Sequence, residues 1–314
     1  YVGILDAFMD SKGLITPEEW RGFCCEVVPL FCTEKFCWAN NEIVTGDIEI
    51  ANYSAGDLDR KQLSWTLTDS KKQVLDEGMI PLQVKQGELV KVGTIKPSVS
   101  AVHKAEKVNL SLSIDGTPYK NSYPLWIYPT DNQSMQPKDI LVATDLDSDM
   151  FNTLKAGGKV LLFPSKEKHQ EQTVGGLFQT DYWNYRMFKS ICENIHRPVS
   201  PGTLGILTDP EHAVFAGFPT DFHTNWQWFP IIKQSYPMIL DRLPNEYRPI
   251  VQVIDNIERN HKLGLLFEFE VEKGKLLVCM SDVKVVWDKP EARQFYNSIL
   301  QYMDSPDFSP SFHL

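Results

Sequence analysis

The sequence lacks any apolar run close to the roughly 18 residues that a membrane-spanning helix requires. It also lacks an excess of positive charge, because 31 lysines and arginines stand against 41 aspartates and glutamates and give a formal charge of −10. A surface of that sign repels phosphate backbones and anionic lipids. We therefore expect no membrane span and no nucleic-acid partner.

Cysteine is scarce, with six residues in 314, and no two of them have the C-x-x-C spacing of a zinc site. The number is also too small for a disulfide scaffold. Two histidines, His212 and His223, stand eleven residues apart without a third ligand at a recognisable spacing. The run Asp145–Asp149 is similar to the start of a calcium loop, but Met150 and Ala156 stand where that loop needs glycine and glutamate. We expect neither a metal nor another cofactor.

The residues that are present describe a folded protein of more than one domain. Apolar residues make up 42% of the chain and charged residues 23%, as in ordinary globular proteins. At roughly 150 residues per domain, this length predicts about two domains. The chain starts at Tyr1 without an initiator methionine or a signal sequence, so we expect a mature product or a fragment of a longer protein.

Residues 1–31 are expected to be helical. Ile4, Leu5 and Phe8 fall on one helical face. The stretch 16–19, TPEE, has the hydroxyl, proline and carboxylate of a helix-starting capping box. Two short helices cannot bury their apolar faces alone. This segment must therefore pack against the next domain or against a part of the protein upstream.

From residue 32 to residue 129, apolar residues alternate with polar ones, which indicates strands with one buried face. Val108, Leu110, Leu112 and Ile114 show the pattern, and the following Asp-Gly pair predicts a hairpin turn. Candidate strands lie at 36–39, 47–50, 63–67, 74–82, 89–95, 108–114 and 123–128. Short strands at this spacing predict an all-β immunoglobulin-like sandwich.

From residue 130 to residue 314, helical and strand patterns alternate. A strand at 139–143, a helix at 148–156 and a strand at 159–163 predict a βαβ unit, which belongs to a parallel sheet covered by helices. Further strands are expected at 204–207, 250–254, 263–271 and 275–280, and a closing helix at 290–303. We predict an α/β domain of three layers, with the last two strands as an antiparallel hairpin at one edge of the sheet.

No complete active site is apparent in the sequence. Cys192 lies in a predicted helix and Cys279 in a predicted strand, and neither has the flanking glycines of a nucleophile elbow. A buried thiol behaves as a small apolar group, so a structural role is favoured for both. Glu268, Glu270 and Glu272 alternate along a predicted strand and are interpreted as its solvated face rather than as paired glycosidase carboxylates.

The segment 218–229, FPTDFHTNWQWF, mixes aromatic and polar residues. Indole rings stack on the apolar face of a sugar, while amides and imidazoles bond its hydroxyl groups. Carbohydrate contact is therefore one interpretation, through Trp226, Trp228, His223 and Asn225, with Trp183 nearby. The alternative, which we favour, is an apolar cluster whose indole N–H groups are bonded locally.

Three stretches resemble parts of glycoside hydrolase family 2 proteins of the β-galactosidase and β-mannosidase type found in Bacteroidetes. The opening VGILDAFMDSKG, with ITPEEW after it, resembles the last helix and exit of the catalytic barrel. The sandwich, with NYS at 52–54 and YPLWIYP at 123–129, is similar to the immunoglobulin-like domain that follows the barrel. The third region, with PGTLG at 201–205 and HTNWQW at 223–228, is similar to a class I glutamine-amidotransferase-like domain of flavodoxin-like fold.

This resemblance implies three parts: a helical remnant of the barrel at 1–31, an immunoglobulin-like sandwich at 32–129 and a glutamine-amidotransferase-like domain at 130–314. It implies a parent enzyme that cleaves β-glycosides with retention through two barrel glutamates, which would lie upstream of Tyr1. No residue here inherits those roles, and the amidotransferase nucleophile and its histidine have no counterpart either. We therefore expect a non-catalytic accessory region that supports the barrel, an oligomer or a glycan contact.

Two other functions stay open. The chain could be a free-standing carbohydrate-binding protein, or a cysteine-dependent hydrolase of the amidotransferase type that uses Cys192 or Cys279. The expected partners are the upstream barrel, an oligosaccharide and a second copy of the chain. The resemblance implies a periplasmic or cell-surface location, which the unpaired cysteines neither support nor exclude.

Overall fold

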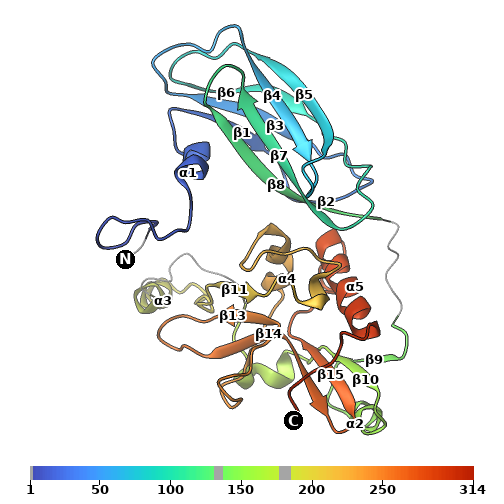
Figure 1. The fold of residues 1–314 in the computed structure, drawn as a ribbon. Coiled ribbons are helices and arrows are strands. Elements are labelled where there is room, and N and C mark those ends of the chain that lie inside the picture. The colour runs from blue at the N-terminus through green and yellow to red at the C-terminus, as the bar shows by residue number, and fades with distance from the viewer. Residues whose placement is uncertain (1–2, 131–136, 177–184) are drawn as a thin grey trace. The chain divides into compact units, whose positions relative to one another are not determined.

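The computed structural model describes residues 3–130, 137–176 and 185–314 and divides the chain into two compact units, Tyr1–Thr130 and Asp131–Leu314. Sheets dominate both units, and each unit has its own (Figure 1). No helix among the described residues has the length and apolar character needed to cross a bilayer.

The first unit is a sandwich of two sheets. The larger sheet has the strand order β2 (Cys37–Ala39), β8 (Lys120–Tyr128), β7 (Glu106–Ile114), β4 (Lys61–Thr68), β5 (Val74–Leu82). The smaller sheet has the order β1 (Val27–Cys32), β3 (Gly46–Asn52), β6 (Glu88–Ile95). Inward-facing residues of both sheets form one core, including Ile48, Ile50, Leu63, Leu67, Val108, Leu110 and Leu112, all without exposed surface.

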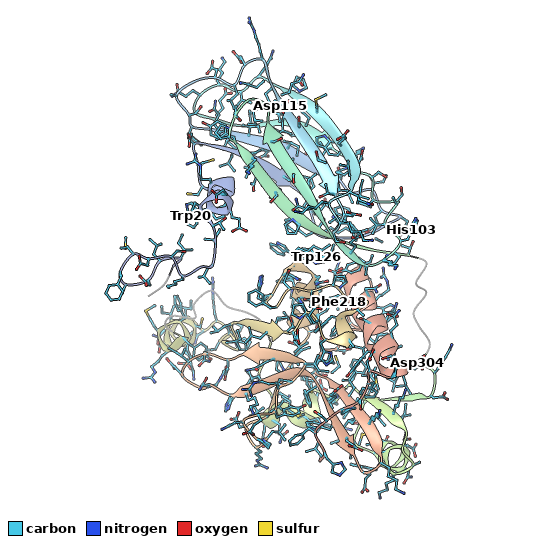
Figure 2. The ribbon with its side chains drawn as sticks, viewed as in Figure 1. Trp20, His103, Asp115, Trp126, Phe218 and Asp304 are labelled. Atoms are coloured by element: carbon cyan, nitrogen blue, oxygen red, sulfur yellow. The ribbon has the colours of Figure 1, made fainter. Side chains whose placement is uncertain are left out.

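The strands of this sandwich follow from the alternation of apolar and polar residues. Along β7, buried Val108, Leu110 and Leu112 alternate with partly exposed polar residues, as a strand with one wet face requires. The Asp115-Gly116 turn then reverses the chain into β8, and Gly116 adopts the positive φ of +69° that favours glycine there. Figure 2 marks this turn by Asp115. The predicted hairpin is confirmed, while the immunoglobulin-like assignment stays a prediction.

The segment before residue 32 is less helical than the sequence predicted. One short helix forms, α1 (Pro17–Phe23), which carries Trp20 (Figure 2). The predicted capping box starts it, since the Glu19 N–H donates to Thr16 Oγ1 at 3.2 Å and the Thr16 N–H donates to Glu19 Oε2 at 2.8 Å. The predicted helix around Ile4–Phe8 was wrong, because the Asp6 carboxylate accepts the N–H groups of Phe8 and Asp10 and holds a chain reversal instead.

The strand β1 was also missed, because helix was predicted up to Phe31. Val27 and Phe31 lie in the sandwich core, and β1 pairs antiparallel with β3 along its whole length. β-Branched residues and a proline suit an edge strand better than a helix interior. The sandwich therefore starts at Val27 rather than at residue 32, and only a shorter stretch precedes it.

The second unit contains one mixed sheet. Its strands follow the order β11 (Gly205–Thr208), β13 (Val251–Ile254), β14 (Lys262–Val271), β15 (Gly274–Cys279), β10 (Lys159–Leu162), β9 (Ile140–Ala143), with β12 (Met238–Ile239) paired to β14. The predicted βαβ unit is confirmed, since β9 and β10 are parallel on either side of α2 (Ser148–Lys155). Only β9, β10 and β15 are mutually parallel, so a flavodoxin-like sheet is not shown.

The hairpin formed by β14 and β15 lies in the middle of this sheet, so its predicted edge position was wrong. Leu276, Leu277, Val278 and Cys279 are successive buried residues, which means that β15 is covered on both faces. A strand with two buried faces belongs at the centre of a sheet. The uninterrupted apolar run in the sequence was the signal for this position.

Helices cover both faces of the sheet (Figure 1). On one face, Met150 and Leu154 of α2 share a core with Phe267 and Phe269 of β14. On the other face, the Tyr302 hydroxyl of α5 (Pro290–Asp304) donates to Glu268 Oε2 at 2.8 Å. The other helical segments of the described residues are η1 (Glu167–Gln172), α3 (Tyr185–Asn194), η3 (Ala213–Phe215), η4 (Trp226–Trp228) and α4 (Phe229–Lys233).

Candidate functional site

Trp228, one of the residues predicted to contact carbohydrate, lies in the core of the second unit. Its side chain has no exposed surface, and its indole N–H donates to Thr220 Oγ1 at 2.7 Å. The rings of Phe215, Phe218 and Phe295 lie 5.2–6.1 Å from it, centroid to centroid. Phe218 is labelled in Figure 2. A sugar cannot stack on Trp228, because both faces of the indole are already covered.

Of the other predicted residues of this segment, Trp226 and His223 are exposed and Asn225 is half-buried. Trp226 is 55% exposed, and His223 is exposed with its Nδ1 bonded to the Thr224 carbonyl at 2.8 Å. The Asn225 amide donates to Asp221 Oδ2 at 3.0 Å. These three neighbours share one short stretch of the surface, so carbohydrate contact through Trp226, His223 and Asn225 stays a prediction. Trp183 lies outside the described residues.

Cys279 lies at a strand end, where this sheet could present a nucleophile, but its side chain is buried. Its thiol is fully buried at the end of β15, and burial raises its pKa to about 12. Segment 231–236 crosses the strand ends: the Ser281 hydroxyl donates to the Ile231 carbonyl at 2.6 Å, and the Tyr236 hydroxyl to the Pro164 carbonyl at 2.6 Å. In sheets of this kind, ligands bind outside the carboxyl ends of parallel strands. Here segment 231–236 contacts the residues that follow β10 and β15.

The thiols should therefore differ sharply in reactivity. We expect iodoacetamide at pH 8 to alkylate the exposed Cys24 and to leave Cys279 unmodified, because the thiolate is the reactive form and a pKa of about 12 keeps Cys279 protonated. Peptide mass spectrometry measures the result. Full alkylation of all six cysteines in urea is the control. Modification of Cys279 in the folded chain at the rate of Cys24 would contradict its burial.

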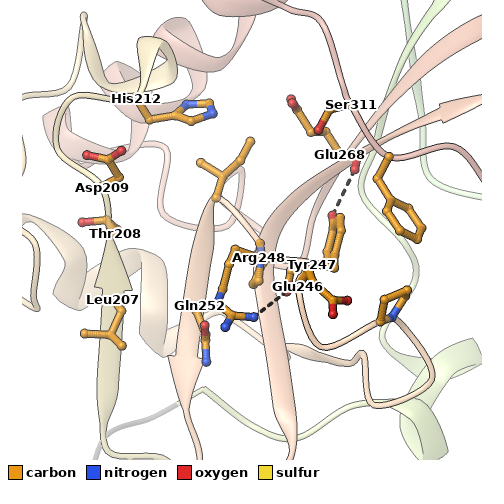
Figure 3. Close-up of a pocket in the computed structure, with 14 residues that line it drawn as sticks. Leu207, Thr208, Asp209, His212, Glu246, Tyr247, Arg248, Gln252, Glu268 and Ser311 are labelled. Atoms are coloured by element: carbon orange, nitrogen blue, oxygen red, sulfur yellow. Dashed lines mark hydrogen bonds between the residues drawn. The ribbon is translucent and has the colours of Figure 1, made fainter.

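The second unit also has a hollow that lies elsewhere, and no sequence motif predicted it. It is a pocket of about 940 Å³ between the end of β11, the loop 244–250, β13, β14 and the C-terminal tail (Figure 3). The polar residues that line it are Thr208, Asp209, His212, Glu246, Tyr247, Arg248, Gln252, Glu268 and Ser311. Leu207, Pro244, Pro249, Ile250 and Phe312 supply its apolar wall.

Glu268 is the most unusual group of the pocket. Its carboxyl is half-buried on β14, on the face opposite to Phe267 and Phe269, and it accepts the Tyr302 hydroxyl. Burial raises the pKa of Glu268, although the Tyr302 hydrogen bond and the charge of Lys275 oppose the shift. The expectation that Glu268 belongs to a solvated strand face was therefore wrong. Glu270 and Glu272, further along the chain, are exposed as predicted.

His212 faces the same hollow from the turn that follows β11 (Figure 3). Its Nδ1 accepts the Val214 N–H at 3.3 Å and caps η3, so a neutral ring carries its proton on Nε2. Burial lowers the pKa of His212 despite the nearby Asp209 carboxylate, which keeps the ring neutral at pH 7. The ring lies 5.3 Å from the ring of Tyr302, so this tyrosine contacts both His212 and Glu268.

The remaining charges give the pocket an acidic balance. Asp209 and Glu246 add carboxylates to Glu268, and Arg248 adds a guanidinium. Arg248 is partly used by its own loop, because Nη1 donates to the carbonyls of Asn245 and Tyr247. Among the described residues, no group of three or more histidines, cysteines, aspartates or glutamates could hold a metal ion. The arrangement can donate and accept hydrogen bonds, and it favours neutral or cationic ligands.

A family model described as "Domain of unknown function (DUF8487)" matches residues 141–314, which is more than half of the chain. The chain belongs to this family. The DUF8487 region includes the whole pocket. A second model, described as "Domain of unknown function (DUF8488)", matches residues 42–129 in the sandwich. No curated protein sequence matches the chain.

Solved structures similar to the chain include glycosidases, at low identity. A Bacteroides fragilis chain assigned as a β-galactosidase is 9% identical over 46% of this chain and 26% of its own, with a TM-score of 0.24. A Parabacteroides merdae β-glucuronidase is 12% identical over 45% and 22%, with a TM-score of 0.24. A β-glucuronidase from glycoside hydrolase family 2 is 12% identical over 52% and 22%, with a TM-score of 0.25. The chain thus spans about a quarter of the length of these proteins.

Proposed function

We propose that this chain is a non-catalytic accessory region of a glycoside hydrolase acting on β-glycosides, where it supports the catalytic barrel, an oligomer or a glycan contact. The sequence motifs that resemble family 2 proteins support the choice of enzyme class. In this proposal the sandwich is the immunoglobulin-like domain and the DUF8487 region is the amidotransferase-like domain of such a protein.

One structural observation carries the non-catalytic part of the proposal. Segment 231–236 is hydrogen-bonded to the residues that follow β10 and β15, and the thiol of Cys279 at the end of β15 is fully buried and protonated at neutral pH. A nucleophile must reach its substrate and ionise or lose a proton to a base. Cys279 can do neither, which disfavours a cysteine-dependent hydrolase that uses this thiol.

The test is turnover by the purified chain. We expect no cleavage of p-nitrophenyl β-galactoside or p-nitrophenyl β-mannoside above the rate in buffer, because the two barrel glutamates implied by the family 2 resemblance would lie upstream of Tyr1. A family 2 β-galactosidase assayed in parallel is the positive control. Enzyme-like turnover that survives further purification would overturn the proposal.

A free-standing carbohydrate-binding protein is the second candidate. The observation in its favour is the exposed Trp226, which lies beside His223 and Asn225 and is 55% accessible. An exposed indole beside polar groups is suited to a sugar's apolar face. This candidate would take first place if the chain proved to be a complete protein.

A further inference from the structure

We infer that the pocket bounded by β11, the loop 244–250, β14 and the C-terminal tail binds a saccharide unit without negative charge, with His212 and Glu268 bonding its hydroxyl groups. The choice of a saccharide rests on the proposed function, since a glycan contact is one of the roles proposed there. The pocket is separate from the surface around Trp226, and none of its lining residues belongs to the segment 218–229.

The size and composition of the pocket suit a small polar molecule. Its volume of about 940 Å³ falls within the range of roughly 300–1,000 Å³ that is usual for ligand sites. Apolar side chains, among them Leu207, Pro244 and Ile250, line it beside the polar groups. A sugar ring presents C–H groups on its faces and hydroxyls at its rim. A site for it therefore needs both apolar and polar side chains.

His212 and Glu268 offer complementary hydrogen bonds to one hydroxyl-bearing ligand. The His212 Nδ1 is occupied by the Val214 N–H, so Nε2–H is left as a donor. Glu268 Oε2 is occupied by the Tyr302 hydroxyl, so Oε1 is left as an acceptor. A hydroxyl group can donate or accept, so the hydroxyls of one sugar can bond both His212 and Glu268.

Both side chains are held in place before a ligand arrives. Tyr302 packs its ring 5.3 Å from the ring of His212 and bonds the Glu268 carboxyl through its hydroxyl. Tyr247, from the loop 244–250, donates to the backbone carbonyl of Glu268 at 3.0 Å (Figure 3). Fixed partners reduce the entropy that a ligand must offset on binding.

The charges select against acidic sugars. Three carboxyl groups, those of Asp209, Glu246 and Glu268, face the pocket, against one guanidinium that also bonds its own loop. A uronate or a sulfated sugar would meet net repulsion in a partly desolvated site. A neutral hexoside meets none.

Calorimetric titration of the full chain tests the inference, with methyl β-galactoside, methyl β-mannoside and methyl β-glucuronide as probes. We expect at least one neutral glycoside to bind, and the glucuronide to bind about tenfold more weakly or not at all. Glu268→Ala should weaken binding of the neutral probe by about tenfold or more, the usual loss when a charged hydrogen-bonding partner is removed. Glu270→Ala, an exposed position on the same strand, is the matched control and should bind as the unaltered chain does.

A second variant keeps the test decisive if Glu268→Ala fails to fold. His212→Asn retains a side chain that caps η3 but is too short to present a donor in the pocket, and it should also weaken binding about tenfold. The inference is overturned if no neutral probe binds, if the glucuronide binds best, or if both variants bind normally while Trp226→Ala does not. Each of these outcomes leaves the turnover test of the proposed function unaffected, so the two can fail separately.

Discussion

Trp228→Ala is expected to destabilise the second unit by about 3–5 kcal/mol, the usual cost of removing a fully buried large aromatic side chain. The indole has no exposed surface and packs against the rings of Phe215, Phe218 and Phe295. Its removal also leaves the Thr220 hydroxyl without the indole N–H that it accepts. Differential scanning calorimetry of the full chain measures the loss, as a lower melting temperature for the transition of the second unit.

Trp226→Ala is the matched control, because it removes the same side chain two residues earlier in the same short helix. Trp226 is 55% exposed, so we expect the free energy of unfolding to change by no more than about 0.5 kcal/mol. Equal losses for the two variants would contradict the assignment of Trp228 to the core and of Trp226 to the surface.

Asp255→Ala is expected to destabilise the same unit by about 3 kcal/mol or more. The Asp255 carboxylate is 1% exposed and bonds the Arg259 guanidinium at 2.6 Å, and it also accepts the backbone N–H of His261 at 3.1 Å. Arg259 further donates to the Pro201 carbonyl at 2.5 Å and lies over the ring of Tyr185. Removing one partner of a buried pair leaves the other charge uncompensated, which costs more than the pair contributes.

Asp241→Ala provides the comparison for this buried pair. Asp241 pairs with His261 at 2.7 Å, but the two side chains are 46% and 31% exposed. Exposed ion pairs contribute about 1 kcal/mol at most, so we expect a correspondingly small loss. Urea titration of the two variants measures their free energies of unfolding. If Asp255→Ala proves as mild as Asp241→Ala, the Arg259 contact does not stabilise this part of the fold.

Local patterns in the sequence predicted most of the strands and the main helices. Alternation located β7 and its hairpin, and the TPEE stretch located α1, because each depends on neighbours along the chain. The failures have a tertiary cause. β1 was missed since Val27 and Phe31 are fixed by pairing with β3, and the hairpin of β14 and β15 was misplaced since its position depends on the distant strands β10 and β13.

The pocket could not be predicted for the same reason. The residues that line it are spread along the sequence from Leu207 to Phe312, and no local motif links them. Glu268 matched the pattern of a wet strand face, and only its contact with α5 makes it a half-buried acid. Trp226 and Trp228 have the same local sequence context. One is exposed and the other buried because only the Trp228 indole packs into the core.

Reading the coding sequence immediately upstream of Tyr1 tests whether this chain is the accessory end of a glycosidase. We expect it to encode a barrel with two glutamates at strand ends, whose carboxyl groups a structure would show about 5–5.5 Å apart, as retaining enzymes require. A start codon next to Tyr1, or an unrelated domain, would contradict it.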